Sequence, residues 1–166
     1  MILYIYCLGE FLIESINKLH PDVRKILRLF RLRQLHNATL LRVNKATLNM
    51  LKRVEPYVTF GYPSRKTISD LVYKRGFGKV NRQRLPLTSN AVVEQTLGNL
   101  GITCVEDLVH ELVTCGPNFK QANNFLWPFK LRCPKGGFIA KRHSFQNDGD
   151  FGNREELINA FVRRMI

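Results

Sequence analysis

Two glycines separated by one residue lie in a basic stretch without acids, Tyr73 to Arg84, which reads YKRGFGKVNRQR. Glycine-rich loops that end in a lysine can cradle the phosphates of a nucleotide. The P-loop pattern G-x-x-x-x-G-K-[ST] ends correctly at Gly78-Lys79, but Tyr73 stands at the first glycine position and Val80 replaces the magnesium-binding hydroxyl. The dinucleotide pattern G-x-G-x-x-G fails at Asn81. The sequence therefore argues against a nucleotide-binding loop.

A second candidate for chemistry is the segment EDLVHEL, in which Asp107, His110 and Glu111 recur at i, i+3 and i+4. On a helix these side chains share one face, where they could bind a divalent metal. The zinc-protease signature H-E-x-x-H would need a second histidine where Thr114 stands. A metal-dependent RNA hydrolase is therefore kept only as an alternative to the simpler interpretation of a solvated helix face. We expect no catalytic residue, no metal and no cofactor.

The charge of the chain is strongly asymmetric. It carries 26 Lys and Arg against 13 Asp and Glu, a net charge of +13. Residues 15–88 hold a net charge of +14, whereas residues 89–166 hold only +1. Cations with so few acids to neutralise them favour a polyanionic partner, and nucleic acid is the default. We expect neither a small-molecule substrate nor a membrane partner.

The apolar amino end, MILYIYCLGEFLIE, is too short for the ~20 apolar residues that span a bilayer and lacks the cationic start of a signal peptide. It is expected to form a buried strand. The cysteines are Cys7, Cys104, Cys115 and Cys133, and no pair has the C-x2–4-C spacing of a zinc knuckle. They are expected to be reduced and mostly buried.

The first half of the chain predicts alternating strands and helices. A helix is expected from Pro21, with an apolar face that includes Ile26 and Phe30 and a basic face along Arg24, Arg28 and Arg31. A half-exposed strand is expected over 38–44, then a helix capped by the asparagine at 44, then a strand over 56–61. With the amino-terminal strand, this order is typical of an α/β sandwich.

The second half predicts further helices and a basic loop. Capping boxes are expected at Thr67–Asp70 and Thr103–Glu106, another helix after Thr88, and a last helix from Asn153. Gly76 is expected to end the first of these helices in a left-handed conformation. The stretch from Lys135, KGGFIAKRHSFQNDGDFG, reads as a glycine-rich loop. The whole chain, 1–166, is expected to form a single domain.

The third candidate for function is a nucleic-acid surface. Cations would contact phosphates, aromatic rings would stack on unpaired bases, and glycines would let the backbone approach the sugar–phosphate chain. The aromatic candidates are Tyr73, Phe77, Phe138 and Phe145. The predicted RNA-binding residues are Arg24, Arg28, Arg31, Arg33, Lys74, Arg75, Gly76, Gly78, Lys79, Asn81, Arg82, Arg84, Lys135, Lys141 and Arg142. The glycines at 136 and 137 belong to the same proposal.

Several segments of the chain resemble one family. They read LRLFRLRQ, MLKRVEPYVTFGYP, LVYKRGFGKVN, LTSNAVVEQTLG, CVEDLVHEL, NNFLWPFKL and GNREELINAFVRRM. In order, and from about residue 16 to residue 166, they are similar to eukaryotic ribosomal protein seven of the large subunit, whose bacterial counterpart is the short ribosomal protein thirty. The resemblance implies a ferredoxin-like α/β core over about 11–62. Over 63–166 it implies an elaboration with additional C-terminal helices and a basic, RNA-contacting loop.

The resemblance also implies a function. It points to a structural constituent of the cytosolic large ribosomal subunit that binds and stabilises large-subunit rRNA beside neighbouring ribosomal proteins, is not an enzyme, and passes through the nucleolus during assembly. The family's basic helix matches Arg24–Arg33, and its KRG-x-GK-x-N segment matches Lys74–Asn81. Nucleolar pre-ribosome assembly factors of the same family are the alternative, and the intact segment NNFLWPFKL favours the ribosomal member. Family members usually carry a basic extension before the segment that matches Ser15, whereas the residues before Ser15 here, MILYIYCLGEFLIE, include no cation.

Overall fold

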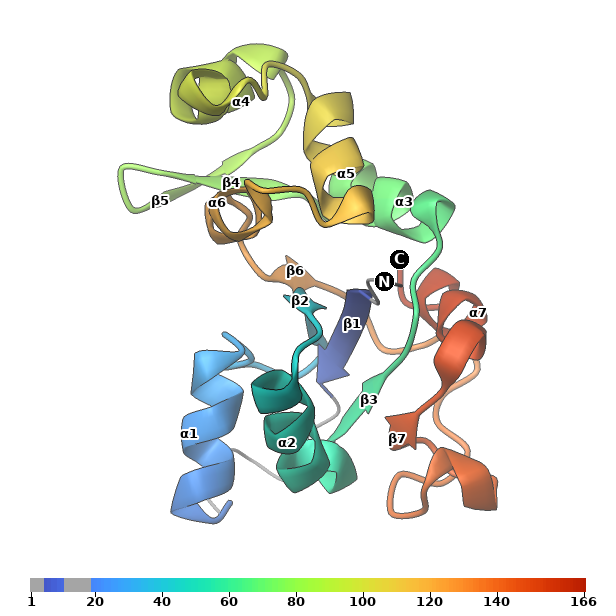
Figure 1. Cartoon of the computed structure of the whole chain (residues 1–166). Coiled ribbons are helices and arrows are strands. Elements are labelled where there is room, and N and C mark those ends of the chain that lie inside the picture. Colours follow the sequence, from blue (N-terminus) through green and yellow to red (C-terminus); the bar gives the residue numbers. More distant parts are fainter. Residues whose placement is uncertain (1–4, 11–18) are drawn as a thin grey trace.

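The computed structural model describes residues 5–10 and 19–166, with the side chains described from residue 19 onward. Five strands form one sheet in the order β6-β2-β1-β3-β7 (Figure 1). Their bounds are β1 Ile5–Glu10, β2 Asn37–Arg42, β3 Val58–Phe60, β6 Phe129–Lys130 and β7 Gly152–Asn153. All neighbours pair antiparallel except β3 and β7, which are parallel. Both edge strands come from the second half of the chain.

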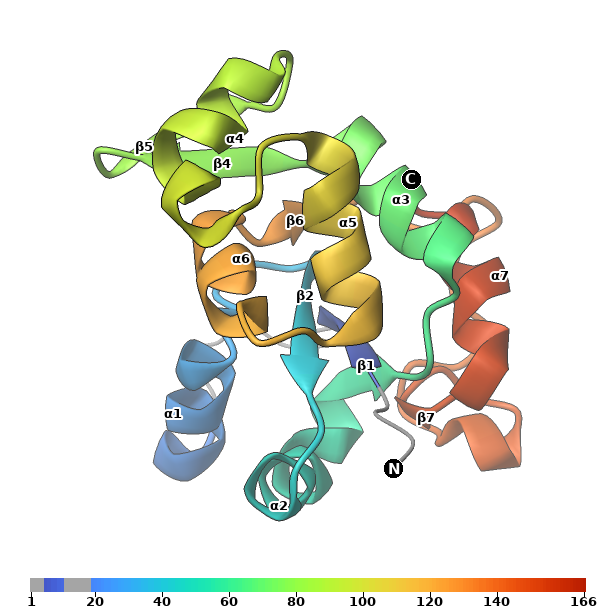
Figure 2. The same cartoon turned by 45° about the horizontal axis from the view of Figure 1, so that its top comes forward.

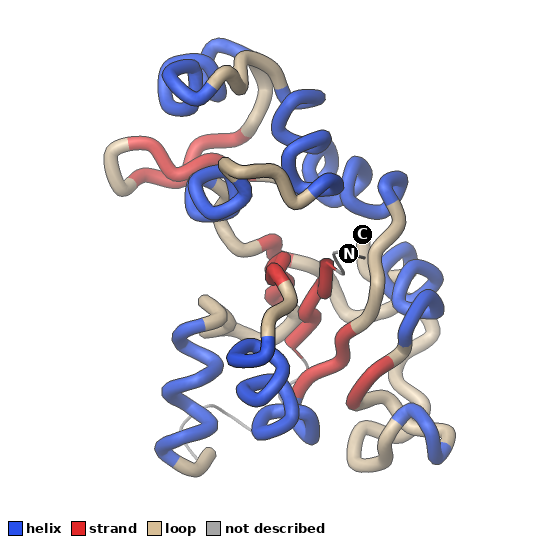
Figure 3. Tube along the Cα trace, viewed as in Figure 1, coloured by secondary structure: helices blue, strands red, loops and turns tan. Residues whose placement is uncertain are grey.

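Helices cover both faces of this sheet (Figures 1 and 3). On one face α1 (Pro21–Leu29) and α2 (Lys45–Val54) pack Leu27 and Leu51 against Val58 of β3. On the other face, Ala38 and Leu40 of β2 join a second apolar cluster. Its helices are α3 (Arg65–Arg75), α4 (Asn90–Leu97), α5 (Val105–Thr114), α6 (Phe119–Phe125) and α7 (Ile158–Arg163). The predicted α/β class and the strand–helix alternation are confirmed.

The first part of β2 is buried on both sides, so the prediction of a half-exposed strand is wrong there, whereas Leu41 is half-buried and Arg42 is exposed. Residues Asn37 to Leu40 are all buried, because the helices of the second half cover the face that sequence alone left open to solvent. Figure 2, which brings the top of the molecule forward, shows α5 and α6 in front of β2. In the described part of the chain, no helix is long and apolar enough to cross a membrane.

The remaining regular elements are a hairpin and short 3-10 turns. The hairpin consists of β4 (Phe77–Val80) and β5 (Gln83–Pro86). The 3-10 turns span Glu55–Tyr57, Gly98–Leu100, Phe145–Asn147 and Glu155–Leu157. The loop from Lys135 therefore contains one such turn and leads into strand β7.

One predicted helix cap is confirmed, and two others lie one to three residues from the predicted position. Asn44 caps α2 as predicted, in a reciprocal box with Thr47. The hydroxyl of Ser64 caps α3, which moves its start three residues before the predicted box. Cys104, not Thr103, caps α5 and pairs with Asp107. Where several neighbouring side chains carry a hydroxyl, thiol or carboxyl group, more than one of them can cap the helix. The sequence alone then does not show which residue is the cap.

The prediction that cysteines are mostly buried is wrong for two of the three whose side chains are described. Cys115 is buried, Cys104 is half-buried at the start of α5, and Cys133 is exposed. All three are free thiols. The strand predicted at the amino end is present as β1, and the side chain of Cys7 lies outside the described residues.

Arg31 follows α1 and joins the two halves of the chain. Its φ of 63° is left-handed. The N–H of Leu32 bonds to the carbonyl of Leu27, the pattern of a Schellman helix end in which glycine is the usual residue. The predicted basic stripe along α1 therefore does not include Arg31.

The Arg31 guanidinium is turned toward the second half of the chain. It donates to the Leu126 carbonyl at 2.9 Å, to the Asn123 carbonyl at 2.9 Å and side-chain oxygen at 3.1 Å, and to Thr39 at 3.4 Å. Burial lowers the pKa of Arg31 from its ordinary value. This set of contacts, called here the Arg31 clamp, ties the helix end to α6 and the segment after it.

A second arginine, Arg154, fixes the carboxyl-terminal segment against β3. It pairs with Asp150 at 2.8 Å, donates to Thr59 at 3.0 Å, and lies over the rings of Phe145 and Phe161. Arg154 and Asp150 are both buried, so each charge depends on the other for compensation. Arg154 is thus a structural cation.

We predict that Arg31→Met lowers the free energy of unfolding by about 2–3 kcal/mol, because it leaves the carbonyls of Asn123 and Leu126 without their charged donor. Arg28→Met, at an exposed position of the same helix, is the matched control and is expected to change stability by less than about 0.5 kcal/mol. Urea denaturation of both variants measures the difference. Equal stability of the two would contradict the clamp.

Candidate nucleic-acid interface

The basic stretch from Tyr73 to Arg84 is the end of a helix followed by a hairpin, not a loop. β4 and β5 pair with Lys79 directly opposite Arg84. Asn81 and Arg82 form the turn, with φ values of 48° and 64°. Positive φ at both central residues is the geometry of a type I′ turn, for which Asn-Gly is the usual sequence.

Two of the glycines predicted to admit RNA, Gly76 and Gly78, are instead covered by the protein itself. A Cβ on Gly78 would lie 2.6 Å from the ring of Phe125, and one on Gly76 would lie 2.1 Å from the Val72 carbonyl. Gly76 has an extended backbone with φ −73°, so the predicted left-handed helix stop is wrong. These two glycines allow α3 and α6 to approach the hairpin closely. At 136 and 137 the glycines have positive φ and open surroundings.

One face of the hairpin carries closely spaced like charges. Lys79 and Arg84 oppose each other, and Arg82 lies beside them at the turn. The Arg84 guanidinium stacks on the Phe77 ring at 3.6 Å, which steadies it and covers that face of the ring. Like charges directly opposite on paired strands are destabilising unless counter-charges are supplied.

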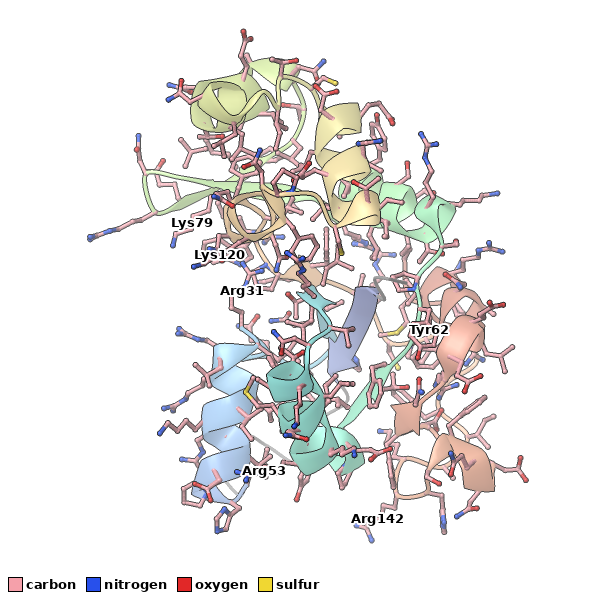
Figure 4. All side chains as sticks on the ribbon, in the orientation of Figure 1. Arg31, Arg53, Tyr62, Lys79, Lys120 and Arg142 are labelled. Atoms are coloured by element: carbon pink, nitrogen blue, oxygen red, sulfur yellow. The ribbon has the colours of Figure 1, made fainter. Side chains whose placement is uncertain are left out.

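A groove of about 550 Å³ lies between this hairpin, the turn after α1 and the segment that follows α6. Its basic members include Arg31 and Lys79, which Figure 4 shows on the same side of the molecule. The groove is lined by Arg31, Arg33, Gln34, Asn37, Lys79, Asn124, Leu126, Trp127, Pro128 and Lys130. It combines four cations, three amide side chains and an indole, and it contains no acid. We call it the basic groove.

Only some of the residues that line the basic groove were predicted from the sequence. Arg31, Arg33 and Lys79 were predicted as RNA-binding residues, whereas Trp127 and Lys130 were not. The pairing of β2 with β6 places Lys130 opposite Asn37, although they are distant in sequence. The aromatic segment NNFLWPFKL was the one feature of the sequence that could have pointed to Trp127 and Lys130. Its residues show no periodicity that would predict an edge strand.

Other predicted cations lie elsewhere. Arg24 and Arg28 line a separate hollow on the outer face of α1. Lys74 pairs with Asp70 at 2.9 Å, and Arg75 donates to the Ile166 carbonyl at 2.6 Å, beside α7. Figure 4 shows Arg142 at the opposite end of the molecule from Lys79. The predicted residues therefore do not form one continuous surface.

Several cations on these surfaces lack internal compensation. Among the described residues, no carboxylate pairs with Arg28, Arg33, Lys79 or Arg82. By contrast, most of the predicted stacking rings are engaged within the protein. The Tyr73 hydroxyl donates to Glu106, which raises the pKa of Tyr73.

The other predicted rings serve similar internal roles. Phe138 packs against the apolar cluster and carries Lys141 over its ring, and Phe145 lies under Arg154. The aromatic side chain that borders the basic groove is Trp127, which is half-buried.

Asp107 and Glu111, which the alternative of a metal-dependent hydrolase would need, make hydrogen bonds at the two ends of α5 instead. Hydrogen bonds with Cys104, and then with Thr103, hold the pKa of Asp107 below its ordinary value. The Glu111 carboxylate accepts the Asn118 N–H at 2.5 Å, and His110 is exposed. Within residues 19–166, no group of three His, Cys, Asp or Glu side chains is placed to hold a metal ion.

Comparison with known proteins shows what the chain is similar to. The family described as ribosomal protein L30p/L7e matches residues 11–58. The large ribosomal subunit protein uL30 of Tetrahymena thermophila is 65% identical over 154 residues, which cover 93% of this chain and 64% of that protein. The uL30 of Drosophila melanogaster is 57% identical over 155 residues, covering 93% of this chain and 62% of that protein. Over 93% of its length the chain is therefore similar to large-subunit uL30 proteins, and part of it matches the L30p/L7e family.

The alignments with the uL30 proteins extend well beyond residues 11–58. At 154 or 155 residues, they include most of the chain. The chain spans 62–64% of the length of these curated relatives.

We predict that Arg82→Gly raises the free energy of unfolding by up to about 1 kcal/mol, because glycine adopts the left-handed turn conformation without strain. Arg82→Ala removes the same charge but keeps the strain, and is the matched control. Thermal denaturation in high salt, which screens the charges, separates the two effects. An equal shift in both variants would mean that the turn geometry carries no strain.

Proposed function

We propose that this chain is a structural constituent of the large ribosomal subunit that binds large-subunit rRNA through the basic groove and the hairpin beside it. The observation that carries the proposal is the set of cations Arg33, Lys79 and Arg82, which have no described carboxylate partner. Similarity to the L30p/L7e family supports it, since proteins that align with 93% of the chain are named as large-subunit proteins.

The electrostatics of the hairpin favour a polyanion as the missing partner. Lys79 and Arg84 repel each other across the strand pair, and Arg82 holds its charge in a strained backbone conformation. Phosphates placed beside them would turn this repulsion into attraction and release condensed counterions. The position of Arg82 at a turn that prefers glycine is consistent with selection for its charge.

The remaining features of the proposal follow from the family. The protein acts as a scaffold and not as an enzyme, with neighbouring large-subunit proteins as further partners. It works in cytosolic ribosomes and passes through the nucleolus during assembly. We also propose that residues 1–166 form one domain, because the segment after residue 62 supplies both edge strands of the sheet.

We predict that replacing Lys79, Arg82 and Lys130 by glutamine together weakens binding to large-subunit rRNA. A plot of the logarithm of the binding constant against the logarithm of the salt concentration has a negative slope. Its magnitude should decrease by about 2, because each of the three lost phosphate contacts contributes about 0.7–0.9. Titration of labelled rRNA fragments at several salt concentrations measures this slope.

In the matched control, three exposed cations on α2 and α3 that lie outside the basic groove are replaced by glutamine. They are Lys52, Arg53 and Arg65. It removes the same charge and is expected to change the slope by much less. If both triple variants lose the same slope, binding depends on net charge alone and the interface is misplaced.

Sedimentation of ribosomes tests the function itself. The tagged full-length protein is expected in mature large subunits and polysomes, because a structural constituent remains in the translating particle. Its presence only in nuclear precursor particles would favour the assembly-factor alternative and overturn the proposal.

A further inference from the structure

The basic groove contains a side-chain amide without a described internal partner. Asn37, at the start of β2, is only 6% exposed and lines the groove. Its backbone N–H bonds to the Gln34 carbonyl, but its carboxamide makes no hydrogen bond to any described residue. The Asn37 amide is thus free to bind a polar group that enters the groove.

The indole of Trp127 borders the same space. Trp127 is the one tryptophan of the chain. Its backbone N–H donates to the Phe77 carbonyl at 2.8 Å, and Pro128 follows it, so its position relative to the hairpin is fixed. Aromatic side chains stack on the faces of unpaired bases, whatever the base.

Three cations complete the groove. Arg33, Lys79 and Lys130 come from the turn after α1, the hairpin and β6, and none pairs with a described carboxylate. Arg31 also lines the groove, but its guanidinium is occupied in the clamp with Asn123 and Leu126. Phosphate oxygens are therefore the expected ligands of the first three cations, while Arg31 maintains the shape of the groove.

We propose that the basic groove binds a single unpaired nucleotide of RNA. The base stacks on Trp127, its edge bonds to the Asn37 amide, and the flanking phosphates contact Arg33, Lys79 and Lys130. This inference rests on the proposed function and goes further, because it specifies an extruded or single-stranded nucleotide instead of the outside of a double helix. A volume of about 550 Å³ is within the range of small-ligand sites and is too small for a base-paired helix.

Asparagine also suggests which base is preferred. Its amide can donate to one ring nitrogen and accept from one amino group at the same time, a pattern that adenine presents. We therefore expect oligoadenylate to bind more tightly than oligouridylate of the same length.

Fluorescence of the single tryptophan tests this directly. We expect a short oligoadenylate to quench the Trp127 emission of the full chain as it binds, because the base covers the indole. A fully paired RNA duplex of similar length is expected to cause no such quenching. Oligoadenylate that binds, by anisotropy of a labelled oligonucleotide, without quenching would overturn the inference.

Variants give a second readout. Trp127→Leu is expected to weaken oligoadenylate binding about tenfold, whereas Trp127→Phe retains most of it, since a ring remains for stacking. Asn37→Ser is expected to abolish the preference for oligoadenylate over oligouridylate. Circular dichroism confirms that each variant is folded, and the quenching experiment on the unaltered chain stands if one is not.

The outcomes separate this inference from the proposed function. If rRNA fragments bind but Trp127→Leu binds oligoadenylate as well as the unaltered chain does, the nucleotide site is wrong and the rRNA-binding function stands. If neither rRNA fragments nor oligonucleotides bind, both proposals fail.

Discussion

The Arg31 clamp is the contact on which the arrangement of the interface depends. α1 belongs to one apolar cluster, and α6 belongs to the other on the opposite face of the sheet. The guanidinium of Arg31 reaches from the end of α1 to the carbonyls of Asn123 and Leu126, while β2 pairs with β6 nearby. The turn after α1 and the segment with Trp127 are thereby held as the two walls of one groove. Without this contact the basic side chains would remain, but their spacing would not be fixed.

The cations of this chain divide into those that serve the fold and those that do not. Arg31 and Arg154 satisfy buried carbonyl, hydroxyl or carboxyl groups, and Arg75 holds the end of α7. Arg33 and Lys79 have no described acidic partner and border the basic groove. A net charge of +13 therefore overstates the charge that is available to a ligand. Part of the available charge lies at the hairpin, where Lys79, Arg82 and Arg84 raise the local potential and favour phosphate.

Local patterns in the sequence predicted the elements well and their contacts poorly. The apolar spacing at Ile26 and Leu27 and the asparagine at 44 specified α1 and the start of α2, because these signals act within a few residues. The roles of Gly76 and Gly78 were mistaken, since only the fold shows that Val72 and Phe125 occupy the space beside them.

The same reasoning explains the site residues that were missed. Asn37 and Lys130 are neighbours only because β6 adds to the edge of β2, a long-range pairing that no local pattern encodes. Charge alone indicated a polyanionic partner but did not identify it. The resemblance to the L30p/L7e family supplied the expected fold and function.

The central claim is that unpaired cations of the basic groove contact RNA phosphates and that the groove accepts an unpaired nucleotide. A density map of the large subunit containing this chain tests both parts in one measurement. The account predicts phosphates beside Arg33, Lys79 and Lys130, with one base against Trp127. A groove that faces bulk solvent, or is filled by side chains of another protein, would contradict it.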